Sequence, residues 1–199
     1  MPEPTGWFWD FGDGSTSTAR HPSHTYAADG VYDVTLRVTG ATGVVEHREP
    51  SLIRVGAPAG NGLLATYFDN IDFTGPAVAR TDPTADFDWG SGSPHASIGV
   101  DTFSARWVGR VQPRFSETYS FQTISDDGVR LWVNDRLVVD NWTDHAPTEN
   151  TGTIALLAGV KYDIRLEFYE NGGGATARLF WSSPSQAREI VPQSRLFAE

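Results

Sequence analysis

Turn-forming residues interrupt this chain so often that no long helix fits between them. Gly, Pro, Ser, Thr, Asn and Asp recur about every eight to twelve residues, and β-branched and aromatic residues alternate in the short runs between them. Clear runs are residues 31–38, 119–123, 129–133, 162–168 and 177–181. Successive side chains of a strand point to opposite faces, so these alternating runs are typical of strands. The pattern predicts an all-β fold.

Two short segments predict how the chain is divided. Asn134-Asp135-Arg136, between two strand-like runs, is typical of a tight hairpin turn. Residues 55–62 (VGAPAGNG) are small and rich in Gly and Pro, which is typical of a linker. We therefore expect a first unit at residues 1–56, a linker at 57–61 and a second unit at 62–199. A chain of 199 residues with 39% hydrophobic content is long enough to bury a core in such an arrangement.

Composition excludes several classes of partner. Fifteen Lys and Arg against 25 Asp and Glu give a net charge of −10, which repels nucleic-acid phosphate and anionic lipid but suits a cation-binding protein. The chain has no cysteine, so it has no disulfide or thiolate zinc site. No apolar run approaches the roughly 18 residues that cross a bilayer, so we expect no membrane insertion. The opening Met-Pro-Glu-Pro is unlike a signal peptide, and we expect the chain to be part of a longer polypeptide.

The first unit carries three motifs of one family, at residues 9–15 (WDFGDGS), 21–26 (HPSHTY) and 30–36 (GVYDVTL). It resembles the polycystic-kidney-disease-type (PKD) domain, an immunoglobulin-like β-sandwich. Gly12 supplies the backbone freedom of a turn, Asp10 and Asp13 are placed to accept from nearby amides, and Tyr26 resembles an aromatic corner residue. A complete sandwich of this kind takes about 100 residues, so we expect a partial unit that is the less stable part of the chain. The resemblance implies a spacer or protein-contact role.

The second unit carries a longer ordered series of motifs, at residues 62–68, 103–109, 116–121, 125–133, 140–145, 158–162, 167–172, 178–181 and 190–192. Over its whole length it resembles the PA-fourteen family, named after anthrax protective antigen and shared by glycosidases, adhesins and toxins. The resemblance implies an antiparallel β-sandwich that closes toward a barrel. Members of this family differ in their loops, so the fold alone settles no activity.

Asp126 and Asp127 are the residues with the clearest chemistry. They lie in a loop between two strand-like runs, followed by Gly128, and adjacent carboxylates repel one another unless a cation lies between them. The resemblance to calcium-dependent lectins of the family implies a cis peptide bond between them. It also implies that Asn171 is a third ligand and that backbone carbonyls of the glycine-rich loop, at Gly173 and Ala175, complete the protein ligands. The alternative is that both aspartates merely accept from turn amides.

A calcium ion with these ligands has room for a sugar. Calcium takes about six to eight oxygens, so this set leaves one or two positions for water or vicinal sugar hydroxyls. We expect Asp126 and Asp127 to bind the carbohydrate through calcium, and Trp142 or Trp89 to offer a stacking face. The glycines at 172–174 have no side chains to grip a sugar, so we expect weak affinity and broad selectivity.

The other acidic residues are weaker candidates for a functional site. Asp140, Asp144 and His145 resemble an acid–base or metal set, but the segment recurs in the family as a structural turn. Glu167 and Glu170 are expected to be solvated. A glycosidase needs two carboxylates across a cleft at about 5–9.5 Å, which adjacent aspartates do not provide, so we expect no enzyme activity from this chain.

The favoured function is therefore a calcium-dependent carbohydrate-binding module of lectin or adhesin type. We expect it to be extracellular, as part of a secreted or surface protein whose neighbouring domains are its other partners. The alternative is a structural spacer or protein-contact module that binds no sugar.

Overall fold

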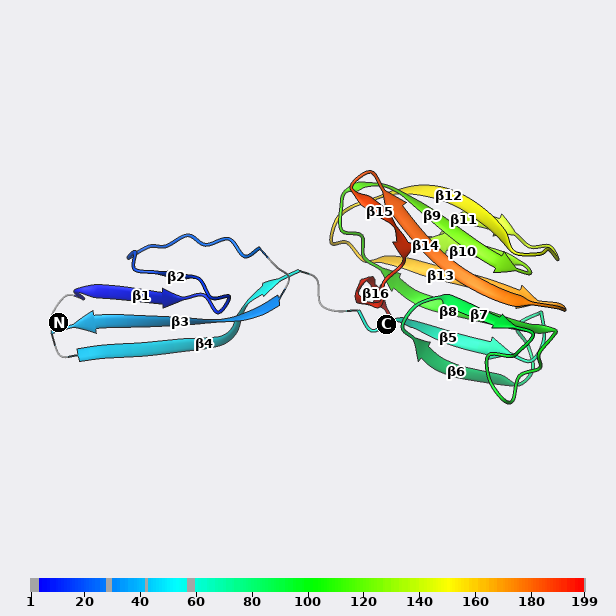
Figure 1. Ribbon diagram of the computed structural model, residues 1–199, viewed down its shortest axis with the longest axis horizontal. Helices are drawn as coiled ribbons and strands as arrows, with labels where there is room; N and C mark the ends of the chain where they lie inside the picture. Colours follow the sequence, from blue (N-terminus) through cyan, green and yellow to red (C-terminus); the bar gives the residue numbers. More distant parts are fainter. Residues whose placement is uncertain (1–3, 28–29, 42, 57–59, 199) are drawn as a thin grey trace. The chain divides into compact units, whose positions relative to one another are not determined.

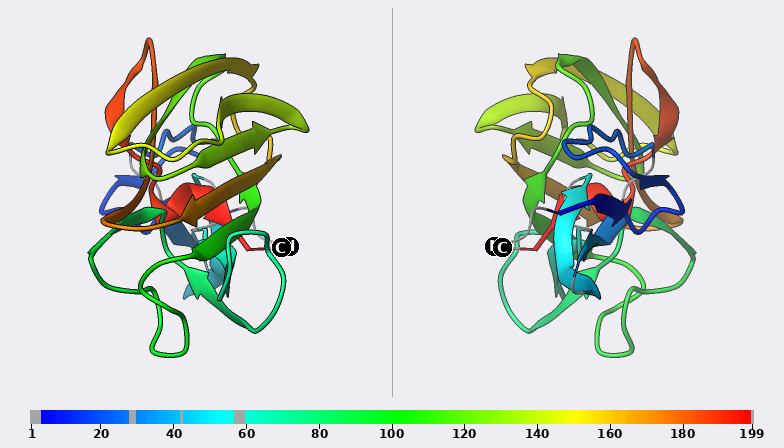
Figure 2. Two further views of the ribbon diagram at one scale, coloured as in Figure 1. Left: turned by 90° about the vertical axis from the view of Figure 1, so that its right-hand side faces the viewer. Right: turned by 90° about the vertical axis from the view of Figure 1, so that its left-hand side faces the viewer.

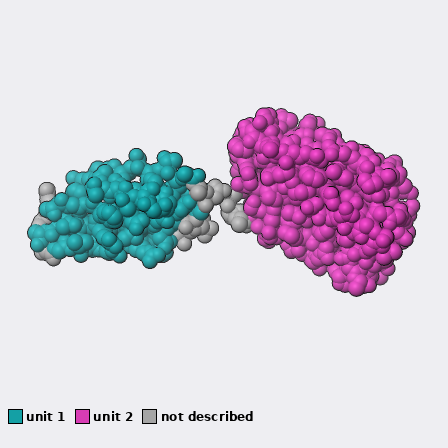
Figure 3. Space-filling model, viewed as in Figure 1, with its two compact units in different colours: residues 1–58 teal, residues 59–199 magenta. Residues whose placement is uncertain are grey.

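The computed structural model describes residues 4–27, 30–41, 43–56 and 60–198, and the chain divides into two compact units, residues 1–58 and 59–199 (Figure 3). The division falls within the predicted linker, of which residues 57–59 lie outside the described part. Almost all regular structure is β-strand, as the alternating runs predicted, and the described residues add one short 3₁₀ turn, η1 (Gln193–Arg195). No helix in the described ranges is long and apolar enough to cross a membrane.

Unit 1 is one antiparallel sheet of four strands in the order β2-β1-β3-β4 (Figure 1). The strands are β1 (Gly6–Asp10), β2 (Thr16–Ser17), β3 (Gly30–Gly40) and β4 (Gly43–Val55). Among its described residues only two hydrophobic side chains are buried, Phe11 and Val34. A single sheet with so little buried apolar surface has a thin core, which agrees with a partial sandwich.

The loop of unit 1 is held by local polar bonds, as the motif predicted. Asp10 Oδ1 accepts from the Gly12 amide at 2.9 Å, and Asp13 Oδ1 accepts from the Ser15 amide at 2.9 Å. The Tyr26 hydroxyl donates to the carbonyl of Phe11 at 3.1 Å, which is the corner role expected of it. Gly12 has φ +78°, and a Cβ there would lie 2.4 Å from the Asp33 carbonyl oxygen, so only glycine fits.

Unit 2 packs two antiparallel sheets on each other (Figures 1 and 2). The first has the order β11-β10-β13-β8-β5-β6, with β16 also paired to β8. The second has the order β12-β9-β14-β15, with β7 also paired to β14. The strands are β5 (Leu63–Phe68), β6 (Ala77–Asp82), β7 (Asp86–Gly90), β8 (Phe103–Val111), β9 (Glu117–Asp126), β10 (Val129–Val133), β11 (Arg136–Asn141), β12 (Thr148–Leu156), β13 (Tyr162–Glu170), β14 (Ala175–Ser183), β15 (Gln186–Ile190) and β16 (Leu196–Phe197).

The core of unit 2 lies between the inner faces of these sheets. In β14 buried residues alternate with partly exposed ones from Ala175 to Trp181, which is the alternation seen in the sequence. The largest fully buried side chains are Trp107, Trp181, Tyr67, Tyr119, Phe103, Phe121 and Phe168. The predicted hairpin turn between β10 and β11 is confirmed, with Asn134 and Asp135 at φ 52° and 59°, the positive values that a two-residue turn requires.

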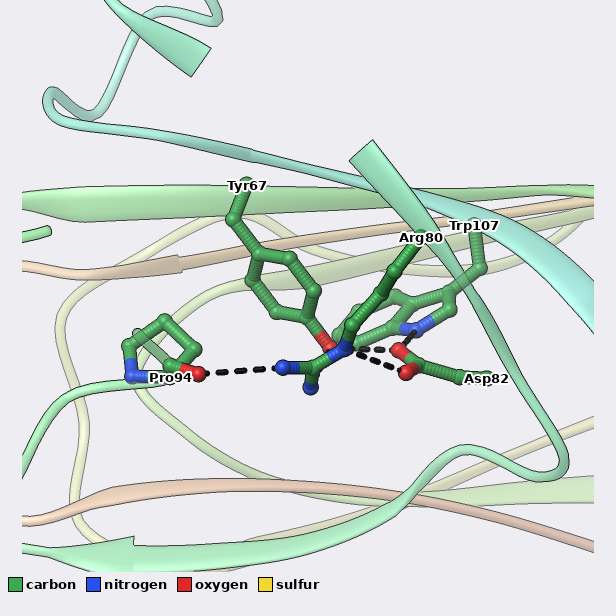
Figure 4. Close-up of polar contacts among 5 residues, drawn as sticks. All are labelled: Tyr67, Arg80, Asp82, Pro94 and Trp107. Carbon is green, nitrogen blue, oxygen red and sulfur yellow. Dashed lines mark hydrogen bonds and ion pairs between the residues drawn. The ribbon is translucent and has the colours of Figure 1, made fainter. Parts of the chain in front are cut away.

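A buried polar cluster anchors one loop to this core (Figure 4). Asp82, at the end of β6, accepts from the Tyr67 hydroxyl at 2.5 Å and from the Trp107 indole N–H at 2.9 Å. Arg80 Nε donates to Asp82 at 2.6 Å, and Arg80 Nη1 donates to the Pro94 carbonyl at 3.1 Å. Burial and the neighbouring Asp82 raise the pKa of Tyr67. The bond from Arg80 to Pro94 ties the β7–β8 loop to this cluster. The same loop carries Asp101, whose carboxylate accepts from the Gly173 amide.

Candidate metal centre

The predicted aspartate pair lies where β9 ends. Asp126 is the last residue of β9, Asp127 and Gly128 form the turn, and β10 begins at Val129. The peptide bond between Asp126 and Asp127 is cis, as the resemblance implied. A Cβ on Gly128 would lie 2.1 Å from Cε1 of Tyr169, so the tyrosine ring packs on this turn only because residue 128 is a glycine.

A third carboxylate joins the pair from β13. One oxygen each of Asp126, Asp127 and Glu170 lie within 4.8 Å of one another. Glu170 is 0% exposed, and within the described ranges neither of its oxygens has a hydrogen-bond partner. The expectation that Glu170 is solvated was wrong, because it continues the inward-facing series Ile164, Leu166 and Phe168 to the end of the strand.

The electrostatics of this cluster favour a bound cation. Burial, followed by the charges of Asp127, Asp126 and Asp101, raises the pKa of Glu170 to about 7, and the Gly172 amide acts in the opposite direction. Burial and then the charge of Asp127 raise the pKa of Asp126, and His145 nearby acts in the opposite direction. Three carboxylates this close together are a set of hard oxygen donors, which is the ligand type that calcium prefers. The residues present therefore fit a calcium ion.

Asp127 ties two loops to the turn. Its Oδ1 accepts from the backbone N–H of His145 at 2.8 Å, in the β11–β12 loop. Its Oδ2 accepts from the backbone N–H of Asn171 at 2.9 Å, in the β13–β14 loop. A carboxylate has about four lone-pair sites, so these two bonds leave Asp127 capacity to bind a cation as well. The alternative that this aspartate accepts from turn amides is thus compatible with a metal role.

The glycine-rich loop lies at the same end of unit 2, the end on the right in Figure 1 and toward the viewer in the left panel of Figure 2. The Asn171 side-chain N–H donates to Asp144 at 2.8 Å, so its amide oxygen is not used in that bond. The Gly173 amide donates to Asp101 at 3.2 Å, and a Cβ on Gly174 would lie 3.6 Å from Asp126 Oδ2. Ala175 is buried at the start of β14. The residues predicted as ligands thus lie at the end of β9, in the turn that follows it, in the β13–β14 loop and at the start of β14, and their roles as ligands remain a prediction.

Both tryptophans predicted as stacking faces are partly exposed and pack against other side chains. Trp142 is stacked with Phe73 at 5.8 Å between ring centroids, and the Arg130 guanidinium lies 4.0 Å from its centroid. Trp89 is stacked with Phe87 at 4.9 Å and packs against the hydrophobic core. Because these contacts engage ring faces, they speak against either residue as a sugar platform.

The acid–base alternative finds no support in the geometry. Asp144 accepts from the Tyr169 hydroxyl at 2.7 Å and from Asn171, and both bonds lower its pKa. His145 Nδ1 lies 2.9 Å from the Ala146 carbonyl. In the described part of the chain these two residues share no side-chain bond, and Asp140 is exposed on β11. The three groups do not form a catalytic set.

Comparison with known families matches each unit of the chain to one domain family. A family model described as the PA14 domain matches residues 60–195, and one described as the PKD domain matches residues 2–55. The chain belongs to the PA14 domain family, with a PKD domain segment before it. Both resemblances seen in the sequence are thereby confirmed.

Three relatives illustrate the range of proteins that carry this fold. The chain is 51% identical over 138 residues to the anti-sigma-I factor RsgI3 of Acetivibrio thermocellus; the match covers 69% of this chain and 21% of that protein, so the chain spans about a fifth of its length. It is similar to a solved anti-sigma factor domain-containing protein from Clostridium clariflavum, with a TM-score of 0.68 and 32% identity over 83% of this chain and 60% of that one. The PA14 sugar-binding domain from an RTX adhesin shares the fold, with a TM-score of 0.57 and 16% identity over 72% of this chain and 100% of that one.

Proposed function

We propose that unit 2 is a non-catalytic, calcium-dependent carbohydrate-binding module of a longer extracellular protein. The observation that carries the proposal is the cluster of Asp126, Asp127 and Glu170, in which one oxygen of each carboxylate lies within 4.8 Å of the others and Glu170 is fully buried. The fold is shared with the PA14 sugar-binding domain of an RTX adhesin, which supports the ligand class.

Different residues of the chain would bind the ion and hold the loops around it. Asp126 and Asp127 would hold the ion, with oxygen from Asn171 and from the carbonyls of Gly173 and Ala175. Asp127 keeps the two neighbouring loops in place through its amide bonds. Calcium bound there would supply coordination positions that vicinal sugar hydroxyls can fill in place of water.

The packed tryptophans and the glycine-rich loop determine the sugar affinity that we expect. With no free aromatic face and few side chains at the rim, a single sugar would gain little beyond its contact with the ion. We expect affinity near about 1 mM, or about −4 kcal/mol, so firm attachment would need several modules or repeated sugar units.

The match to an anti-sigma-I factor favours a second role for the same site. In that case the module would bind its ligand on behalf of a regulatory protein, whereas an adhesin would use it to attach to a surface. Both roles need a functional calcium site and differ in the domains that neighbour this chain.

The test compares glycan binding of the wild type and of Asp126→Asn. Asp126 accepts no hydrogen bond from the described residues, so this change removes one charge and leaves the loop bonds of Asp127 in place. We expect binding of diol-bearing sugars in calcium, none in chelator or in magnesium, and none by Asp126→Asn. Asp135→Asn, in the exposed β10–β11 turn, is the matched control and should bind as the wild type does.

Thermal unfolding separates loss of the ion from loss of the sugar. Millimolar calcium should raise the melting temperature of the wild type and not that of Asp126→Asn, because a ligand that binds only the folded state stabilises it. A wild type that binds calcium but no sugar on a broad array in saturating calcium would favour the spacer function. Sugar binding that survives both chelator and Asp126→Asn would refute the calcium mechanism.

A further inference from the structure

Glu170 is a buried glutamate that the protein leaves without a partner. It is 0% exposed, and neither oxygen accepts a hydrogen bond from the described residues. A buried carboxylate in this state is costly, and native structures normally pair such groups with donors, charges or metals. Its position therefore needs a partner that enters from outside the chain.

The same strand shows how this protein treats a buried glutamate with a structural role. Glu167, three residues earlier, is 3% exposed and was also expected to be solvated, which the structure corrects. Its two oxygens accept from Arg106 at 2.9 Å and from Arg130 at 2.8 Å. A third cation, Arg165, lies at 3.8 Å. Glu167 thus has protein cations around it, whereas no ion pair to Glu170 occurs among the residues that the structure describes.

The groups that face Glu170 carry negative charge. Asp126 and Asp127 lie in the same cluster within 4.8 Å, and Asp101 approaches from the β7–β8 loop, where it accepts from the Gly173 amide at 3.2 Å. Asp127 already uses both oxygens to hold loop amides. Asp126 accepts no hydrogen bond from the described residues, and for Glu170 the nearby Gly172 amide is the group that favours the charged form, although neither Glu170 oxygen meets hydrogen-bond geometry with it.

We propose that Glu170 is a direct ligand of the cation and brings the site to three carboxylates. The inference rests on the proposed calcium site and extends it, since Asp126, Asp127 and the loop oxygens were the ligands expected from the sequence. Calcium affinity rises with the number of charged ligands. The dissociation constant of this site should therefore lie below the value of about 10⁻⁴–10⁻³ M that is usual for extracellular modules.

Burial separates the role of Glu170 from that of Asp126. Asp126 is partly exposed, so a sugar hydroxyl can approach the ion from its side, whereas Glu170 is closed off from solvent. Glu170 therefore sets how tightly the ion is held and does not contact the sugar. Loss of the Glu170 carboxylate should therefore weaken calcium binding but leave the sugar affinity of the calcium-saturated protein nearly unchanged.

The experiment measures calcium affinity by calorimetry on the full chain, with Glu170→Gln as the variant and Glu167→Gln as the matched buried control. We expect Glu170→Gln to weaken calcium binding at least about tenfold, because one of three charged ligands is lost. Glu167→Gln should leave calcium affinity within about twofold of the wild type, since its partners are arginines. In chelator, Glu170→Gln should melt at or above the wild-type temperature, because it removes a buried charge that its neighbours repel.

The outcomes distinguish this inference from the proposed function. If Glu170→Gln binds calcium as tightly as the wild type while Asp126→Asn does not bind it, the calcium site stands and the role of Glu170 is refuted. If the wild type binds no calcium, both are refuted. An equal loss of melting temperature in chelator and in calcium would mark Glu170 as a structural residue only.

A second measurement keeps the inference testable if Glu170→Gln does not fold. The side-chain carboxyl carbon of Glu170 in the wild type, followed by NMR, should shift on calcium saturation, while that of Glu167 should not. A Glu170 resonance that stays in place when calcium saturates the protein would overturn the assignment.

Discussion

The two units of this chain are both antiparallel β-structure, yet they are stabilised differently. Unit 1 is a single sheet in which Phe11 and Val34 are the buried hydrophobic residues among those described. Its loop is held by polar bonds and by a series of ring contacts that joins Phe11, His24, Tyr26 and Tyr32, with centroid separations of 4.2, 4.6 and 4.5 Å. Unit 2 closes two sheets over a continuous aromatic core.

The difference explains which unit can hold a costly site. A buried, unpaired glutamate lowers stability, and only a unit with a large core has enough stability to retain it. Glu170 lies at the end of the same inward face of β13 that contributes Leu166 and Phe168 to the core. In unit 1 the carboxylates near the loop, such as Asp10 and Asp13, instead accept from amides within two residues in sequence.

The largest effect should come from truncating the core of unit 2. Trp107 is fully buried and donates its indole N–H to Asp82, so Trp107→Ala should lower the free energy of unfolding by about 3–5 kcal/mol. Val34→Ala, its counterpart in unit 1, should lower the free energy of unfolding by about 1–2 kcal/mol, because it removes only two methyl groups from a thin core. Chemical denaturation with hydrogen exchange read separately for each unit checks both values. Equal losses would contradict a difference in core depth.

A smaller effect is expected in native-state hydrogen exchange. Amides of β3 in unit 1 should exchange at least about tenfold faster than those of β13 in unit 2, equivalent to about 1.4 kcal/mol in opening free energy. The reason is that β13 lies between two other strands and faces the core, whereas β3 has little buried surface beneath it. Equal protection of residues 31–38 and 162–168 in the monomeric protein would refute the expected weakness of unit 1.

Sequence predicted the fold because its signals were local. Strand alternation, the Asn134-Asp135 turn and the Asp-Phe-Gly-Asp-Gly loop depend on neighbours a few residues away, and each lies in the structure as expected. Asp126 and Asp127 stand side by side in sequence, and their cis peptide bond was expected for the same reason, while their role as ligands stays a prediction.

The residues that sequence reasoning missed depend on distant partners. Trp142 packs against Phe73 and Arg130, which lie on other elements, and the residues next to Trp142 in the sequence do not predict those contacts. Glu170 was missed although a signal existed. Alternation from Ile164 through Phe168 places residue 170 on the inward face, and a glutamate at an inward position beside an acidic loop indicates a cation site.

The smallest effect concerns acid sensitivity in unit 1. The hydrogen bond from His24, followed by that from the Ser15 amide, lowers the pKa of Asp13 below its ordinary value of 3.8. A carboxylate whose folded-state pKa is lowered contributes stability that is fully present above its unfolded-state pKa and is lost as the pH falls through the folded-state value. Unit 1 should therefore lose this contribution below about pH 4, and by a small amount because the pair is exposed to solvent.

Asp13→Asn is the variant that isolates this contribution, since it keeps an acceptor for the Ser15 amide but has no charge to titrate. The Ser15 amide resonance should titrate below about pH 4 in the wild type and not in Asp13→Asn, and the acid-induced increase in β3 exchange should be smaller in the variant. Identical titration curves in the two proteins would assign the acid sensitivity of unit 1 to other carboxylates.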